Sequence, residues 1–154
     1  MRRLWILLAA VGLLGAALPA AAATGRVIKV LPQFLDLKGR NSTSPSLFER
    51  DAYQAFLRDH TNQCSGIRFA VQWKSKGAPA APLKLQVQIH GVARGSYPEQ
   101  RVLELPVKPG GWFSRWSSLD LTGNDFKDLG SVTAWRVTLW EGTKVIGEQK
   151  SFLW

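Results

Sequence analysis

Few side chains of this sequence are of the types that do chemistry, and they are widely spaced. The 154 residues include two histidines, one cysteine and 11 carboxylates. The closest grouping is Asp59, His60 and Cys64, whose types can hold a metal ion or pair a thiolate with a base. Their spacing matches no established zinc pattern, and a fourth ligand is missing. The sequence therefore predicts no metal site, no cofactor and no catalytic residue, so we expect a protein that is not an enzyme. A pocket that gathers these three side chains is the alternative.

The remaining polar side chains favour structural roles. Glu49 and Asp51 flank Arg50 on a predicted helix, which is typical of a solvated face with weak ion pairs. His90 falls on the polar face of a predicted strand, where we expect it to be exposed to solvent. Cys64 follows the helix and is predicted to be a small buried hydrophobic group, with an intermolecular disulfide as the alternative.

Tryptophan is unusually frequent, with seven in the chain. The spacing of Trp112 and Trp116 places both on one strand face beside Arg115, whereas Trp140 falls on the face opposite Trp135. Exposed indoles beside cations suit stacking on sugar rings or anchoring a protein partner. The sequence therefore predicts a ligand-binding role for Trp112, Arg115, Trp116 and Trp140.

The net charge narrows the range of partners. The 20 Lys and Arg residues against 11 Asp and Glu give a net charge of +9, of which Arg2 and Arg3 contribute two. The cations are scattered along the chain and form no basic run of the kind found in nucleic-acid arms. A cationic surface attracts anionic lipids, wall polymers or acidic proteins. We therefore expect an envelope protein or an anionic or glycan envelope polymer as partner, and no nucleic acid.

The first 23 residues have the pattern of an export signal. Arg2 and Arg3 precede an apolar run over residues 4–18, which Pro19 and four alanines close with A-x-A cleavage sites. We predict cleavage after Ala23, a secreted or periplasmic location, and no membrane span once the signal is removed. A retained anchor is the alternative, because about 20 apolar residues can cross a bilayer.

Residues 24–154 have the length of one domain and read as short strands. Apolar and polar residues alternate over 67–74 and 83–90, which predicts two half-buried strands. Trp73 and Trp135 lie on apolar strand faces, so we expect both to be buried. Glycine and proline turns bound the other predicted strands, which cover residues 26–37, 101–107, 112–121, 132–140 and 145–153. About seven strands favour a mainly β fold, an antiparallel sandwich, over a parallel α/β sheet.

One short helix is predicted between the first two strands, ending near Asp59. Ser46 and Glu49 have the spacing of a capping box. The helix then carries an apolar stripe of Phe48, Ala52, Ala55 and Phe56. We expect it to cover one open end of the sandwich.

Five stretches resemble small exported bacterial proteins of unknown function. They are SPSLFERDAYQAFLR (44–58), CSGIRF (64–69), VQWK (71–74), WRVTLW (135–140) and QKSFLW (149–154). The resemblance spans most of residues 24–154 and implies no activity, so it transfers no catalytic residue. At the level of fold, the strand number is similar to that of immunoglobulin and fibronectin type III modules.

The sequence thus predicts an exported, non-catalytic binding or assembly module of the cell envelope that acts through its surface and loops. The alternative is recognition of an anionic or glycan envelope ligand by a basic, Trp-bearing surface. An enzyme, or a small outer-membrane barrel suggested by Phe152 and Trp154 near the end of the chain, is a weaker alternative.

Overall fold

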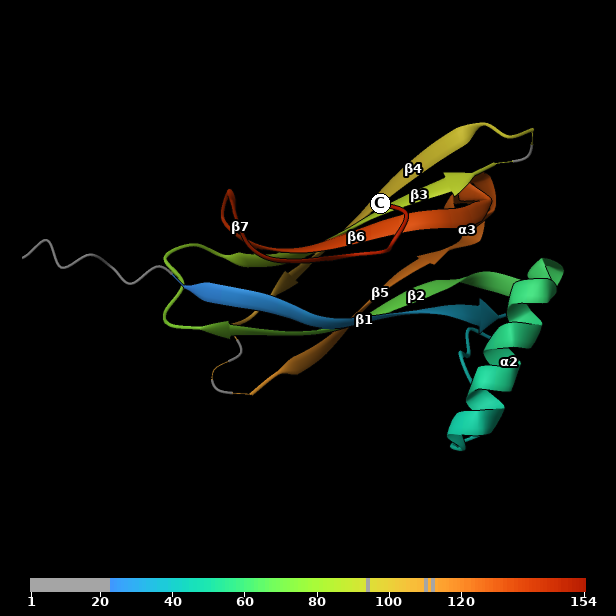
Figure 1. The fold of residues 1–154 in the computed structure, drawn as a ribbon, viewed down its shortest axis with the longest axis horizontal. Coiled ribbons are helices and arrows are strands. Elements are labelled where there is room, and N and C mark those ends of the chain that lie inside the picture. The colour runs from blue at the N-terminus through green and yellow to red at the C-terminus, as the bar shows by residue number, and fades with distance from the viewer. Residues whose placement is uncertain (1–22, 94, 110, 112) are drawn as a thin grey trace, which may run out of the picture.

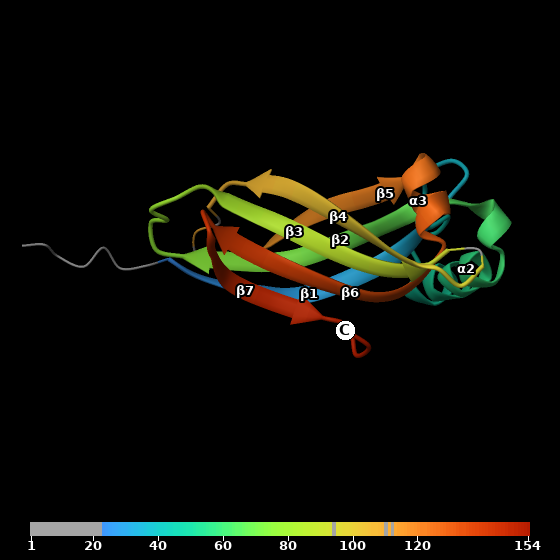
Figure 2. The same cartoon turned by 90° about the horizontal axis from the view of Figure 1, so that it is seen from above.

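Two antiparallel sheets pack face to face in a sandwich-like arrangement (Figure 1). A computed structural model describes residues 23–93, 95–109, 111 and 113–154. The predicted signal segment, apart from Ala23, lies outside the described residues. Figure 2 shows that the strands of the two sheets run along the same long axis. The ends of the strands therefore lie at the two ends of the molecule.

The described chain contains seven strands, two α-helices and one 3-10 turn. In chain order they are β1 (Thr24–Asp36), α2 (Leu47–Asp59), η2 (Thr61–Gln63), β2 (Cys64–Lys76), β3 (Leu83–Val92), β4 (Pro98–Val107), β5 (Arg115–Thr122), α3 (Gly123–Leu129), β6 (Ser131–Glu141) and β7 (Lys144–Lys150). The three-stranded sheet has the order β1-β2-β5, and the four-stranded sheet has the order β4-β3-β6-β7.

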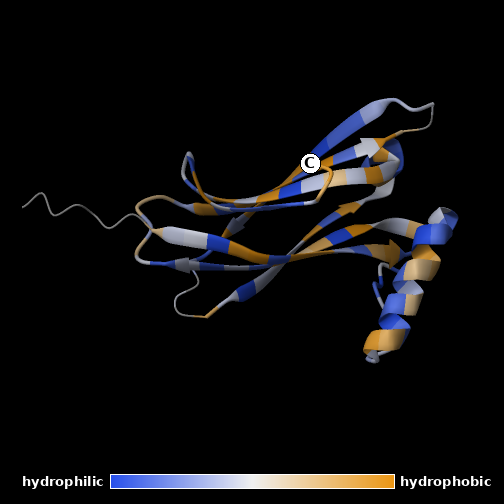
Figure 3. Cartoon of the chain, viewed as in Figure 1, coloured by the Kyte–Doolittle hydropathy of each residue, from blue (hydrophilic) through white to orange (hydrophobic). Residues whose placement is uncertain are grey.

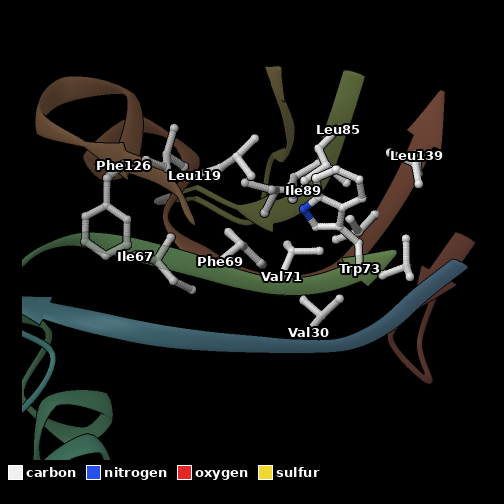
Figure 4. Packing of buried hydrophobic residues seen from close by; sticks show 14 of the residues in the cluster. Val30, Ile67, Phe69, Val71, Trp73, Leu85, Ile89, Leu119, Phe126 and Leu139 are labelled. Carbon is white, nitrogen blue, oxygen red and sulfur yellow. The ribbon is translucent and has the colours of Figure 1, made fainter. Parts of the chain in front are cut away.

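The core lies between the inner faces of the two sheets (Figure 4). The alternation predicted over 67–74 is confirmed, because Ile67, Phe69, Val71 and Trp73 are all buried on the inner face of β2. Each fully buried side chain of this size contributes about 1.5–3 kcal/mol. Trp135 is half-buried and meets Phe69 edge to face, with 6.5 Å between ring centroids. Among the described residues, the buried core cluster lies between Val27 and Leu139, within the chain from Thr24 onward.

The predicted helical stripe is wrong in orientation. α2 begins at Leu47, Ser46 makes no side-chain cap, and the stripe that includes Phe48 and Phe56 is exposed to solvent. Figure 3 shows the hydrophobic stretches of α2 at the right-hand end of the three-stranded sheet. Leu57 is the buried residue of the helix, and Gln54 on the same side bonds β1 through both the N–H and the carbonyl of Phe34, at 2.7 and 3.0 Å.

Asp36, at the end of β1, holds this end of the chain together. Its carboxylate accepts hydrogen bonds from the backbone N–H groups of Lys38 and Arg40, each at 2.8 Å, and from the Tyr53 hydroxyl of α2 at 2.8 Å. The Arg40 guanidinium adds an ion pair at 2.8 Å. Burial alone raises the pKa of a carboxyl group, but these donors outweigh it and lower the pKa of Asp36 well below its ordinary value.

The end of the chain and a second helix also differ from expectation. The strand expected over 145–153 ends at Lys150, after which Ser151 donates its N–H to the Trp135 carbonyl at 2.9 Å. The Trp154 ring stacks on His90 at 4.2 Å, with the Arg136 guanidinium 5.0 Å from the ring centre. His90 is therefore half-buried.

α3 occupies a segment whose Gly-Asn-Asp sequence indicates a turn. This helix buries Phe126 and Leu129 against the end of the core. Its close fit depends on Gly91, where the β3–β6 register shifts. A Cβ at Gly91 would lie 2.5 Å from the Leu129 carbonyl oxygen and 2.7 Å from Leu129 Cγ.

We predict that Gly91→Ala lowers the free energy of unfolding by about 1–3 kcal/mol, because α3 must shift to admit the methyl group. Urea unfolding followed by near-ultraviolet circular dichroism measures this loss. Ser118→Ala, at an exposed position of β5, is the control and should change little. An unchanged unfolding midpoint for Gly91→Ala would contradict the close approach of α3.

Asp36→Asn should lower the free energy of unfolding by about 2 kcal/mol at neutral pH, because it weakens hydrogen bonds to a charged acceptor. The wild-type contribution is complete above the ordinary carboxyl pKa of about 3.9 and is lost as the pH falls towards the lowered pKa. The difference between the two proteins should therefore shrink in strong acid. Asp51→Asn, exposed on α2, is the control, and a pH-independent difference would refute the role of the charge.

Candidate functional site

A basic face covers one half of the three-stranded sheet. The outward positions of β1, β2 and β5 bring together Arg26, Lys29, Gln72, Lys74 and Trp116, and we call these five residues the basic face. Arg26 pairs with Lys74 across β1 and β2, and the next row contains Lys29, Gln72 and Trp116. Directly paired side chains on one sheet face have Cβ atoms about 4.5–5.5 Å apart. The register thus places an indole, an amide and three cations within reach of one ligand.

The aromatic and amide groups of this face are accessible. Trp116 is 51% exposed on an outward position of β5. Gln72 is half-buried beside it, and its amide donates to the Ser114 hydroxyl at 3.0 Å. A held amide next to an exposed indole offers a flat apolar surface together with hydrogen-bonding atoms.

The charge of the basic face is not neutralised locally. Within the described residues, Arg26, Lys29 and Lys74 form no ion pair. Asp120 is the carboxylate among the described outward residues of these three strands. It accepts two hydrogen bonds from the Arg68 guanidinium, at 2.8 and 2.7 Å. Hydrogen bonding to this carboxylate raises the pKa of the Arg68 guanidinium. The basic face therefore attracts anions without a competing internal partner.

The structure divides the predicted ligand-binding residues. Arg115 and Trp116 are neighbouring exposed residues at the start of β5, whereas Trp112 lies outside the described residues. Trp140 is on β6, in the outer face of the other sheet, where its Nε1 donates to the Thr138 hydroxyl at 2.7 Å. Lys84 of β3 lies 6.0 Å from the centre of the Trp140 ring. Trp140 and Trp116 thus face opposite sides of the sandwich and cannot share one ligand.

The cations of the basic face were not predicted from the sequence. Alternation puts Lys74 on the polar side of its strand, but only the strand register places Arg26 and Lys29 beside it. The bulge between Val27 and Lys29 matters here, because it adds one residue to β1 and turns Lys29 to the outer side.

The grouping of Asp59, His60 and Cys64 does not form a site. No cluster of three metal-binding side chains occurs among the described residues. The exposed His60 ring stacks on Phe56 at 4.2 Å, while Cys64 is buried, as expected, and its thiol donates to the Leu57 carbonyl at 3.2 Å. Burial raises the pKa of this thiol, which keeps it protonated and unreactive at neutral pH.

A pocket of about 200 Å³ lies beside the end of β1. It is lined by Asp36, Leu37, Lys38, Arg40, Tyr53 and Gln63. The carboxylate of Asp36 already accepts hydrogen bonds from the surrounding chain and is paired with Arg40. This hollow therefore belongs to the structural link between β1 and α2.

No protein-family model and no curated protein matches this chain. Neither helix of the described residues has the length and apolar character to cross a lipid bilayer. The candidate site therefore rests on the geometry of the chain itself.

We predict that iodide quenches the fluorescence of Trp116 more strongly than caesium does, because the three cations concentrate anions at its surface. The difference between the spectra of the wild type and Trp116→Phe isolates this indole. In Lys29→Glu/Lys74→Glu the preference for iodide should disappear, whereas Lys127→Glu/Lys150→Glu, with the same charge change elsewhere, should retain it. Equal quenching by both ions in the wild type would contradict the local positive potential.

Proposed function

We propose that this chain is an exported, non-catalytic binding module of the cell envelope that holds an anionic or glycan ligand against the basic face. The observation that carries the proposal is the set of three cations around the exposed indole of Trp116 that have no ion-pair partner among the described residues. Its export rests on the predicted signal in the first 23 residues, which places it in the periplasm or outside the cell.

The chemistry of the basic face fits such a ligand in two ways. Its cations draw an anion in over roughly one Debye length, about 8 Å at physiological salt. At contact, the flat indole of Trp116 stacks on a sugar ring, and the Gln72 amide can exchange its bond with Ser114 for one to the ligand. Because strands β1, β2 and β5 fix these groups, binding orders little additional chain.

The strand order supports an immunoglobulin-like or fibronectin type III-like sandwich. In immunoglobulin notation the sheets read A-B-E and C′-C-F-G, because the fourth strand pairs with the third instead of with the fifth. Sandwiches of this class serve many functions through their surfaces and loops. Binding of a ligand on an outer sheet face is consistent with the way sandwiches of this class function.

An envelope protein is a second candidate partner, favoured by the outer side of α2. Phe48 is 83% exposed and Leu47 is 72% exposed on the first turn of this helix. Exposed apolar side chains of this size commonly mark protein contact sites. Such a partner would bind at the opposite end of the molecule from the basic face.

The test is co-sedimentation of residues 24–154 with separated envelope fractions at low and high salt, followed by mass spectrometry of retained material. We expect salt-sensitive binding that falls at least about fivefold in Trp116→Ala and about tenfold in Lys29→Glu/Lys74→Glu. Lys127→Glu/Lys150→Glu should bind like the wild type.

Two results would overturn the proposal for the basic face. One is the absence of binding to any envelope fraction at low salt. The other is salt-resistant retention of a single protein that Phe48→Ser abolishes and Trp116→Ala leaves unchanged, which would establish α2 as the binding surface instead.

A further inference from the structure

The cations that are scattered in the sequence gather at one end of the folded chain. Strand register joins the beginnings and ends of strands there: Thr24 pairs with Lys76, Arg115 with Trp73, and Leu83 with both Val107 and Glu141. Lys84 at this end is paired with Glu104 at 2.8 Å. Six further cations, which we call the basic end, are Arg26, Lys74, Lys76, Lys108, Arg115 and Lys144. None of them forms an ion pair within the described part of the chain.

Carboxylates are concentrated towards the other end. The carboxylates in α2, in α3 and at the strand ends near these helices are Asp36, Glu49, Asp51, Asp59, Glu99, Asp120, Asp125 and Asp128. At the basic end itself, Glu141 is buried, and it accepts a hydrogen bond from the Ala80 N–H at 2.6 Å. Seven described cations share that end with the eight carboxylates, so it is close to neutral, whereas the basic end is positive; these cations are Lys38, Arg40, Arg50, Arg58, Arg68, Arg101 and Lys127. An anionic surface would therefore orient the molecule with the basic end inward.

The basic end also presents an exposed apolar side chain. Phe113 is 83% exposed in the connection between β4 and β5, two residues before Arg115. The first strand, β1, begins at this same end, where Thr24 pairs with Lys76.

We propose that the basic end docks on the surface of an anionic lipid bilayer, with Phe113 entering the boundary between headgroups and acyl chains. This inference goes beyond the proposed function, because it assigns the phosphate headgroups of a leaflet to the basic end as a ligand separate from that of the basic face. The cations come from both sheets, so they spread over the end of the sandwich and match a plane of charges better than a single polymer strand. A hydrophilic polymer, in addition, has no apolar region to receive Phe113.

The energetics of this docking combine two weak contributions. Each Lys or Arg at an anionic membrane surface strengthens binding about fivefold, and the effect fades within a Debye length. One inserted aromatic side chain adds roughly tenfold, and this part resists salt because it depends on buried apolar area. Charge with a single apolar insertion gives reversible peripheral attachment.

Flotation of residues 24–154 with vesicles tests the inference. We expect binding to vesicles of phosphatidylglycerol mixed with phosphatidylcholine and none to phosphatidylcholine alone. Lys76→Glu/Lys144→Glu, which alters the basic end but not the basic face, should lower the partition coefficient at least about 25-fold. Lys127→Glu/Lys150→Glu is the matched control, with Lys127 in α3 and Lys150 beside the middle of β6, and should change it less than about twofold. Phe113→Ser should lower it roughly tenfold and remove the salt-resistant fraction.

The outcomes separate this inference from the proposed function. Binding to soluble polyphosphate or to envelope polymer that depends on Trp116, without binding to anionic vesicles, would overturn the lipid surface and leave the proposed function intact. Vesicle binding that Lys76→Glu/Lys144→Glu does not weaken would overturn the orientation. Absence of binding to both vesicles and envelope fractions would overturn both proposals.

Discussion

The fold depends on the packing of alternate β2 side chains against the opposite sheet. Ile67, Phe69, Val71 and Trp73 occupy successive inward positions, and the single polar atom in this row, Nε1 of Trp73, donates to the Ser117 hydroxyl at 3.0 Å. A shift of one residue would move this row to the solvent side of the sheet. The packing therefore fixes the register of β2 with both neighbours, and with it the outward position of every cation on the basic face.

The strands were predictable because their periodicity is local, whereas the surfaces were not because they depend on register. Residues 67–74 carry their own alternation, and burial of Trp73 follows from it. The sequence of the helix shows one apolar stripe, but long-range hydrogen bonds from Gln54 and Tyr53 to β1 turn another side of the helix towards the sheet. α3 was not predicted, because its first residues are typical of a turn and Phe126 and Leu129 are its only apolar side chains. The separation of Trp116 from Trp140 required knowledge of which strands share a sheet.

The distribution of charge on the surface also depends on the packing of the interior. Charged residues are few at the inward positions of the sheets, where Arg101, Arg115 and Glu141 are found, so most cations lie on outer faces and at strand ends. Acidic residues lie largely in the helices and connections at the α2 end, where Asp36 uses its charge to organise the chain. The separation of charge along the axis thus arises because the connections that contain helices lie at one end of the sandwich and connections without helices lie at the other. A binding role for the basic face and an orienting role for the basic end share this one origin.

The folded-back end of the chain has a mechanical consequence. Residues 151–154 leave β7 and cross to β6 and β3, where Trp154 rests on His90 and beside Arg136. Tension applied beyond Trp154 is therefore first borne by ring stacking on two strands of the sheet and by the Ser151 bonds to Trp135. Only after these contacts part does the load reach the β6–β7 ladder, whose hydrogen bonds then open one at a time from the Lys150 end. Residues 151–154 therefore protect the edge strand β7 from small pulling forces, because their contacts must break first.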